Sequence, residues 1–384
     1  MIITTRDPCG VYKVGSSIFA NKAEAVYRSS VERLPVTWDF HEDVYSKFDW
    51  TKRPAGTIRE HYRDRAQQIR DKYDHVAVLF SGGMDSWTVL HSFLDNNIHV
   101  DEIITNWPMK KLRYHDVNKD DYREANLFSE FKYAVLPVLE YVRKNFPKTK
   151  ITIDDYSDIL EGDFTEDRLR TSNAWQFMSS VGRIQGRSEL CDTALDHNKS
   201  VVRVVGSEKT RIRVIDNKLY SYFIDLYPSG PTPNGAILEC FYHSVDAPLL
   251  AILQAHYLRD AIIEKTLNGT QNVLVEKIAT RGRSRYDLLY AETCYPDFPI
   301  DTFQTGKMLG THVRDSDRWI EQHNPKFYQG WKWSYDQFFN SLDDSLTKKH
   351  NGEVVGLLAY FSGKYLVDDN FIGSDLGQYE WNRS

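Results

Sequence analysis

Hydrophobic and polar positions follow two alternating patterns in the central part of the chain. Short apolar runs with many β-branched residues, such as HVAVLF and SVVRVVG, are typical of buried strands. Stretches such as DSWTVLHSFL lie between them and carry apolar residues at helical spacing. Strands that alternate with helices predict an α/β fold, a parallel twisted sheet with helices on both faces. The predicted strands span residues 75–80, 100–107, 148–157 and 200–206, and the predicted helices span 85–94, 121–145 (interrupted at Pro137) and 173–198.

The segment before this region has a mixed pattern. Residues 10–26 indicate a short hairpin that leads into a helix, and residues 55–73 indicate a charged amphipathic helix. We therefore predict an N-terminal cap over residues 1–72, packed on an α/β domain over residues 73–228.

The segment after the α/β region begins at a cluster of prolines and glycines. This cluster, residues 227–235, is the best candidate linker. The following region, residues 236–384, is rich in Tyr, Trp and His. Its pattern predicts a helix over residues 247–267 and a late hairpin over residues 353–367 that turns at residues 362–364. We expect a mixed α+β region here.

Composition narrows the class of protein. The chain of 384 residues is 41% hydrophobic and 27% charged, with a formal net charge of -6, which is typical of a soluble globular protein. This charge does not favour a general nucleic-acid coat. The four cysteines lie far apart, without the CxxC pairs of many metal sites. No secretory signal or run of roughly 20 apolar residues is present, so we expect a cytoplasmic protein without membrane contact.

The sequence SGGMDS, residues 81–86, lies between a predicted strand and a predicted helix. Gly82 and Gly83 let a backbone approach a phosphate closely, and the hydroxyls of Ser81 and Ser86 can donate to phosphate oxygens. Asp85 is a candidate Mg²⁺ ligand, because a carboxylate beside phosphates needs a cation between them. The Walker A spacing GxxxxGK[ST] is absent. The alternative is an ordinary tight turn in which Asp85 or Ser86 caps the helix.

This motif resembles the PP-loop signature SGGxDS of the ATP pyrophosphatase superfamily, which includes the synthetase domains of asparagine and GMP synthetases, 7-cyano-7-deazaguanine synthase, tRNA thiolation enzymes and lysidine synthetase. The resemblance implies a Rossmann-like ATP-binding domain over residues 73–228, with the pyrophosphate held by residues 81–86, Met84 included, and Mg²⁺ on the phosphates. A substrate oxygen is adenylated, pyrophosphate leaves, and a nucleophile displaces AMP. Residues 236–384 would then form the substrate region.

The same resemblance implies further ATP contacts at the ends of two other strands. Thr105 and Asn106 would offer backbone contacts to the base, with Asn106 as an ordinary turn residue being the alternative. The second segment is VVRVVGSEKTR, whose Gly206, Glu208, Lys209 and Arg211 follow the fourth predicted strand.

In this second segment, Lys209 would act with Asp85 in catalysis as a mobile charge on the β- and γ-phosphates. Glu208 would assist the metal, although the family often has Asp at this position. Arg211 would contact phosphate or a substrate carboxylate. A solvated charged turn is the alternative.

Missing motifs restrict the reaction. The chain has no clustered cysteines of the kind that thiolation enzymes or 7-cyano-7-deazaguanine synthase use, and Ile2 and Cys9 do not match a glutaminase nucleophile. We therefore expect an AMP-forming ligase that joins an activated carboxyl or carbonyl carbon to an amine or to ammonia, supplied free or by a partner subunit. The segments VTWDFHEDVYSKFDW and ECFYHSVDAPLL are similar to phage proteins labelled asparagine-synthase-like, which implies the host cytoplasm.

Two alternatives remain at this stage. The first is a module that binds ATP or AMP without chemistry, and the second is an enzyme that modifies a nucleobase in tRNA or DNA. The basic segment from Lys277 to Arg285 could bind a nucleic acid, although such segments are more often solvated. His243 and His256 lack a further ligand at metal-site spacing, so we expect core or surface roles for them.

Overall fold

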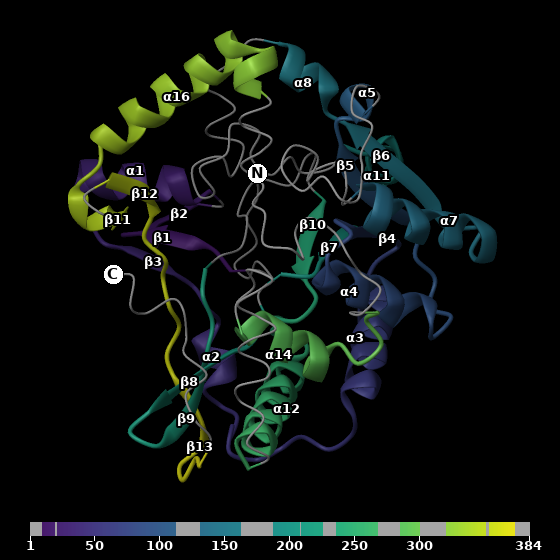
Figure 1. Cartoon of the computed structure of the whole chain (residues 1–384), viewed down its shortest axis with the longest axis vertical. Helices are drawn as coiled ribbons and strands as arrows, with labels where there is room; N and C mark the ends of the chain where they lie inside the picture. Colours follow the sequence, from purple (N-terminus) through teal and green to yellow (C-terminus); the bar gives the residue numbers. More distant parts are fainter. Residues whose placement is uncertain are drawn as a thin grey trace.

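A five-stranded parallel sheet forms the centre of the protein (Figure 1). Its strand order is β10-β7-β4-β5-β6, which confirms the predicted α/β fold with helices on the sheet. The strands are β4 (His75–Leu79), β5 (Glu102–Trp107), β6 (Lys150–Asp155), β7 (Val201–Val205) and β10 (Ile237–Cys240). The computed structural model describes residues 10–19, 21–112, 131–162, 187–207, 209–225, 236–267, 285–299, 320–350 and 353–372.

Four of these strands match the predicted strands, whereas the edge strand β10 was not predicted. It follows the predicted linker and pairs in parallel with β7. The sheet thus takes one strand from the region that the sequence assigned to the C-terminal unit. The boundaries of the three predicted regions stay a prediction.

Both faces of the sheet are covered, which explains the nearly continuous apolar strands. On one face Val76, Val78 and Val204 belong to the main core with α3 (Ile58–Lys72) and α4 (Met84–Leu94). On the other face Ala77 and Ile104 pack with Cys191 and Ala194 of α11 (Glu189–Asp196). Burial of each large apolar side chain stabilises this arrangement by about 1.5–3 kcal/mol.

The order of the strands creates a switch point beside β4. The chain runs from β4 outward to β5 and β6, and then returns to β7 on the other side of β4. In open α/β sheets, ligands bind at the carboxyl ends of the strands where the winding changes direction. The segments that follow β4 and β7 are therefore the places to examine for a site.

The predicted helices agree with the described residues. The predictions over 55–73, 85–94 and 247–267 are confirmed by α3, α4 and α12 (Pro248–Leu267). Of the segment 121–145, the described part is a π-helical turn η1 (Phe131–Val135) followed by α7 (Leu136–Asn145). Pro137 lies in the first turn of α7, where its missing N–H breaks no intrahelical bond. Of the segment 173–198, the described part contains α11.

The N-terminal segment forms a small antiparallel sheet with the order β2-β1-β3, and α1 packs on β1. This confirms the predicted hairpin and helix over residues 10–26. The elements are β1 (Tyr12–Val14), β2 (Ser17–Phe19), α1 (Lys22–Glu32) and β3 (Val36–Trp38). A buried ion pair of 2.7 Å between Lys22 and Asp225, with the Tyr12 hydroxyl 2.9 Å from Asp225 Oδ2, ties this sheet to the segment after β9 (Lys218–Tyr222).

The predicted hairpin over residues 353–367 is wrong. β12 (Glu353–Leu357) pairs with β11 (Thr347–His350), whereas β13 (Tyr365–Asp368) joins the antiparallel sheet β13-β9-β8. Ser362 explains the separation, because its N–H donates to the carbonyl of Phe223 at 3.1 Å and its Oγ accepts from the Phe223 N–H at 2.9 Å. The turn is therefore held by the end of β9, and β13 continues along it. The sheet also contains β8 (Arg211–Ile215).

The remaining elements are short or lie on the outside of these sheets. No helix among the described residues is long and apolar enough to cross a membrane. The remaining short or outer elements are α2 (Glu42–Tyr45), α5 (Met109–Leu112), α8 (Ser157–Glu161), α14 (Arg285–Cys294), α16 (Pro325–Asn340) and η4 (Asp344–Leu346).

Asp101 connects α3 to the start of the sheet and predicts a pH-dependent stability. Its carboxylate accepts from the Val76 N–H at 2.8 Å and from Arg70. Burial would raise the pKa of Asp101, but these hydrogen bonds and the positive charge of Arg70 lower the pKa below its usual value. A lowered folded pKa stabilises the fold above the unfolded pKa of about 4, and the contribution is lost as the pH falls through the folded pKa.

We expect Asp101→Asn to lower the free energy of unfolding by about 1–2 kcal/mol at pH 7, with a smaller difference near pH 3. Urea unfolding at the two pH values measures it. Asp71→Asn, at an exposed position on α3 next to Arg70, is the control. An equal loss of unfolding free energy for Asp101→Asn at both pH values would contradict this account.

Candidate functional site

The loop that joins β4 to α4 is closed by its own two serines. Ser86 Oγ accepts from the Ser81 N–H at 3.2 Å, lies 3.2 Å from Ser81 Oγ, and donates to the Gly83 carbonyl at 3.1 Å. The N-cap of α4 is Gly83, and no side chain caps this helix. Asp85 and Ser86 lie inside the first turn, so the alternative in which one of them is the N-cap is wrong. The uncapped first turn can accept an anion.

Two glycines let this loop pack closely against its neighbours. Gly82 has φ +76°, and a Cβ there would lie 2.6 Å from Val135 Cγ2 of η1. A Cβ on Gly206, which follows β7, would lie 2.8 Å from both the carbonyl carbon and the carbonyl oxygen of Asp85. The glycines are thus required by protein packing as well as by the predicted approach of a phosphate.

Asp85 and Lys209 meet at this loop, although 124 positions separate them in the sequence. Lys209 Nζ donates to Asp85 Oδ1 at 3.1 Å, and the Tyr295 hydroxyl donates to the same oxygen at 2.5 Å. The side chain of Asp85 is 35% exposed, so it is reachable from solvent. Both of these hydrogen bonds go to Oδ1, and the second carboxylate oxygen can therefore meet a cation.

Three tyrosines that the sequence did not single out surround this ion pair. Tyr242 donates to the Asp85 carbonyl at 2.8 Å, and Lys209 Nζ lies 4.7 Å from the ring centre of Tyr290 and 5.9 Å from that of Tyr295. These aromatic rings favour the cation of Lys209 over their faces. The tyrosine-rich composition after residue 236 was the available signal, but it did not show which rings face the loop.

The phenols of Tyr242 and Tyr295 stay protonated in this setting. Burial raises the pKa of each well above the usual value, and the negative charge of Asp85 raises it further. Both hydroxyls therefore remain hydrogen-bond donors that hold Asp85 in place.

Two further predicted site residues, Thr105 and Asn106, lie on β5. Thr105 is buried, and its hydroxyl accepts from the Trp107 indole at 2.6 Å. Asn106 lies inside β5, so the alternative of a turn residue is wrong. Pairing of β5 with β4 ends at Ile104, whereas pairing with β6 continues to Trp107. The end of β5 therefore extends past β4 on the side of the loop.

The remaining predicted site residues are placed as follows. Met84 is buried as the first residue of α4. Arg211 is the first residue of β8 and pairs with Tyr222, so it belongs to the antiparallel sheet. Lys209 is largely buried, with 13% of its side chain exposed, which contradicts a solvated turn at that position. Glu208 lies outside the described residues, and its predicted metal role stays a prediction.

The two histidines are core residues, as expected. His243 stacks on Tyr45 with ring centres 5.0 Å apart, and burial lowers the pKa of His243 to about 3. His256 is buried, with its Nε2 atom 3.0 Å from the Trp50 carbonyl.

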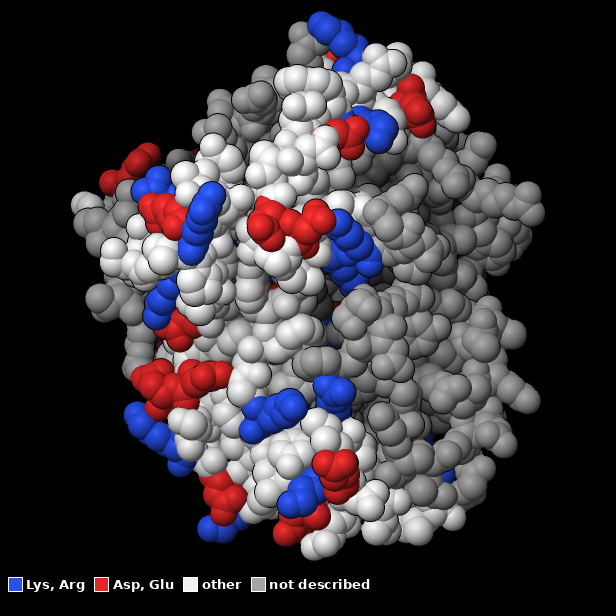
Figure 2. Space-filling model, turned by 90° about the vertical axis from the view of Figure 1, so that its left-hand side faces the viewer, with Lys and Arg blue, Asp and Glu red and all other residues white. Residues whose placement is uncertain are grey.

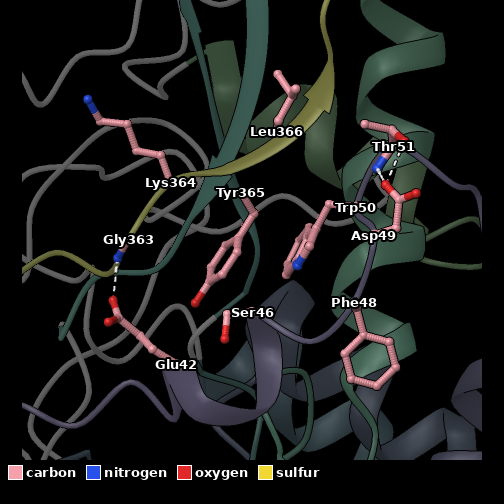
Figure 3. Close-up of a pocket in the computed structure, with 10 residues that line it drawn as sticks. All are labelled: Glu42, Ser46, Phe48, Asp49, Trp50, Thr51, Gly363, Lys364, Tyr365 and Leu366. Carbon is pink, nitrogen blue, oxygen red and sulfur yellow. Dashed lines mark hydrogen bonds between the residues drawn. The ribbon is translucent and has the colours of Figure 1, made fainter.

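A separate cavity of about 460 Å³ lies between the segment after α2 and the start of β13 (Figure 3). Trp50 and Tyr365 stack along it with ring centres 4.5 Å apart, and Glu42 bonds the Gly363 N–H at one side. None of its lining residues belongs to residues 81–86 or 206–209. The cavity is therefore distinct from the loop site.

Charged side chains do not gather by sign on the face shown in Figure 2, where Lys and Arg lie among Asp and Glu. This mixed surface matches the modest net charge of -6. The basic segment 277–285 lies outside the described residues except for Arg285 at the start of α14.

No protein-family model matches the chain, and no curated protein matches it. The case for a function therefore depends on the geometry of the loop and on the chemistry of its residues.

Proposed function

We propose that this protein is an ATP-dependent, AMP-forming ligase of the PP-loop class, which uses Mg²⁺. The observation that carries the proposal is the contact between Asp85 and Lys209 beside the glycine-rich turn at the switch point of the sheet. A bound polyphosphate needs positive charge and hydrogen-bond donors. Here a lysine and an uncapped helix N-terminus lie beside an acid that can hold the metal ion. An ordinary structural turn requires none of them.

Each residue then has a defined task. The first turn of α4 and the hydroxyls of Ser81 and Ser86 would hold the pyrophosphate part of ATP. Lys209 would move from Asp85 to the β- and γ-phosphates, while Asp85 would hold Mg²⁺ with its second carboxylate oxygen. Mg²⁺, when bound, supplies positive charge that stabilises the pyrophosphate leaving group. Tyr242 and Tyr295 keep Asp85 oriented throughout.

The nucleophile in this proposal is an amine or ammonia. The described cysteines Cys191, Cys240 and Cys294 are all buried, and burial raises the pKa of the Cys294 thiol. No described cysteine is therefore suited to release ammonia from glutamine. The nitrogen would come from free ammonia, from an amine substrate or from a partner subunit.

The test is to identify the nucleotide product. Incubation with ATP and Mg²⁺ is expected to yield AMP and pyrophosphate when the correct acceptor is present. The panel contains amino acids, small carboxylates, tRNA and DNA, each with ammonia or glutamine. Products are separated by ion-exchange chromatography. Ser81→Ala is expected to reduce pyrophosphate release by about 100-fold, since it removes one donor to the leaving group.

Ser92→Ala is the matched control, because Ser92 lies further along α4 and its hydroxyl donates to the Thr88 carbonyl of the same helix. Formation of ADP, or a Ser81→Ala variant as active as Ser92→Ala, would contradict the proposal. Bound ATP that stays intact across the whole panel would favour a binding module. Product formation only with tRNA or DNA would favour nucleobase modification.

A further inference from the structure

Three potential metal ligands converge at the amino end of the sheet, opposite the loop site. They are His75 at the start of β4, Glu102 at the start of β5 and Cys191 in the first turn of α11. One ligand atom from each residue lies within 4.8 Å of the other two. Glu102 and Cys191 are fully buried, and 12% of the His75 side chain is exposed. At about 3.3 Å per strand residue, His75 lies roughly 20 Å from Ser81.

The fold places these side chains on one face. Parallel register sets Ala77 of β4 beside Glu102 of β5, so Glu102 shares a face with Ala77 and therefore with His75, two residues earlier. This is the face that α11 covers, through Cys191 and Ala194. Residues from two strands and one helix thus meet at a buried point that no local spacing in the sequence would indicate.

The distances match a metal site. His75 Nε2 lies 3.4 Å from Glu102 Oε2, and Cys191 Sγ lies 3.3 Å from the same oxygen. Zinc bonds of about 2.0–2.2 Å to nitrogen or oxygen and about 2.3 Å to sulfur give tetrahedral edges of roughly 3.2–3.6 Å. Two of the three distances between ligand atoms therefore match the edges of a zinc tetrahedron, and the third, between His75 and Cys191, is no more than 4.8 Å.

Neighbouring hydroxyls hold the carboxylate in position. Ser188 Oγ lies 2.7 Å from both oxygens of Glu102, and the Thr152 hydroxyl donates to Oε1. Ser188 also caps α11 by accepting from the Cys191 N–H at 3.1 Å. Such outer hydrogen bonds orient the ligands of metal sites.

We propose that His75, Glu102 and Cys191 bind one zinc ion that fastens α11 to the start of β4 and β5. An imidazole, a thiolate and a carboxylate together suit zinc, whereas Mg²⁺ and Ca²⁺ select oxygen ligands. The fourth position is left to a water molecule. This site is independent of the proposed ligase function. A cluster held only by hydrogen bonds is the competing explanation.

The experiment begins with the metal content of the full chain, expressed in zinc-containing medium and purified without chelator or affinity tag. Mass spectrometry of the metals is expected to find about one zinc per chain. Cys191→Ser and His75→Gln are expected to reduce zinc occupancy at least about tenfold. Cys240→Ser removes another buried cysteine, on β10, and is expected to retain zinc.

Replacement of zinc by Co²⁺ tests whether the Cys191 thiolate is a metal ligand. The Co²⁺ form of the wild-type chain is expected to show a thiolate-to-cobalt charge-transfer band that is absent from Cys191→Ser. If Cys191→Ser fails to fold, the wild-type metal content and cobalt spectrum decide the question. Wild-type protein without zinc and without this band overturns the proposal, and so does a folded Cys191→Ser variant that keeps both. These readouts do not depend on ATP or on any product.

Discussion

Asp85→Asn is expected to lower the rate of pyrophosphate release by at least about 100-fold while leaving the chain folded. Asparagine keeps the size of the side chain, and its carbonyl oxygen can still accept from Tyr295 and Lys209. The change therefore removes the negative charge with little effect on packing. Without that charge the loop would lose its proposed metal ligand, and Lys209 loses the ion pair that holds it beside the loop.

The measurement is a pyrophosphate-release assay at increasing Mg²⁺ concentration, with the acceptor identified by the product screen. A shift of the Mg²⁺ dependence to higher concentration would locate the defect at the metal. Asp95→Asn is the matched control on the same helix, since Asp95 contacts His91 at the far end of α4. A wild-type rate and Mg²⁺ dependence in Asp85→Asn would exclude Asp85 as the metal ligand.

Gly206→Ala is expected to weaken ATP binding by at least about 10-fold with a smaller effect on the global fold. The added Cβ would lie 2.8 Å from the carbonyl group of Asp85 and 3.1 Å from the Ser86 nitrogen. All these neighbours are backbone atoms, so relief requires the loop or the end of β7 to move. Overpacking of this kind costs about 1–3 kcal/mol, and the displaced first turn of α4 would no longer present its N–H groups together.

Calorimetric titration with ATP and Mg²⁺, together with thermal unfolding, separates these two effects. We expect affinity to fall at least about 10-fold, because loop displacement is localised at the binding groups. Gly162→Ala is the control, since its Cβ would meet the Asp158 carbonyl at an ordinary distance of 3.6 Å. Unchanged ATP affinity in Gly206→Ala would show that the phosphates do not bind beside this contact.

The parallel sheet was predictable because its strands carry a local signal. A strand buried on both faces must be apolar along most of its length, as in HVAVL of β4, and this pattern is visible without knowledge of the partner strand. The edge strand β10 carries a weaker signal. It has only four residues, and its Glu239 forms a buried ion pair with Arg65 of α3. A charged residue in so short a segment argues against a buried strand, so β10 was not recognised. In the structure, Arg65 of α3 neutralises that charge.

The error at residues 353–367 has a related cause. Alternating side chains indicate strands but do not indicate which edges pair, and here the backbone of Phe223 holds the intervening turn. The tyrosines around Asp85 were also missed because the sequence does not show which distant residues meet. Tyr242 and Tyr295 are two of 23 tyrosines, and only the packing of α12 and α14 shows which of them reach the loop.

The sequence by itself determined the α/β class, four of the five strands of the parallel sheet and the position of the loop at residues 81–86, because each depends on residues adjacent in the chain. Tertiary structure alone decided that Lys209 reaches Asp85, that Tyr295 holds the same carboxylate, and that His75, Glu102 and Cys191 meet. Those contacts join residues on separate strands and helices. Their distances are set by strand order and register, which arise from the packing of the whole chain.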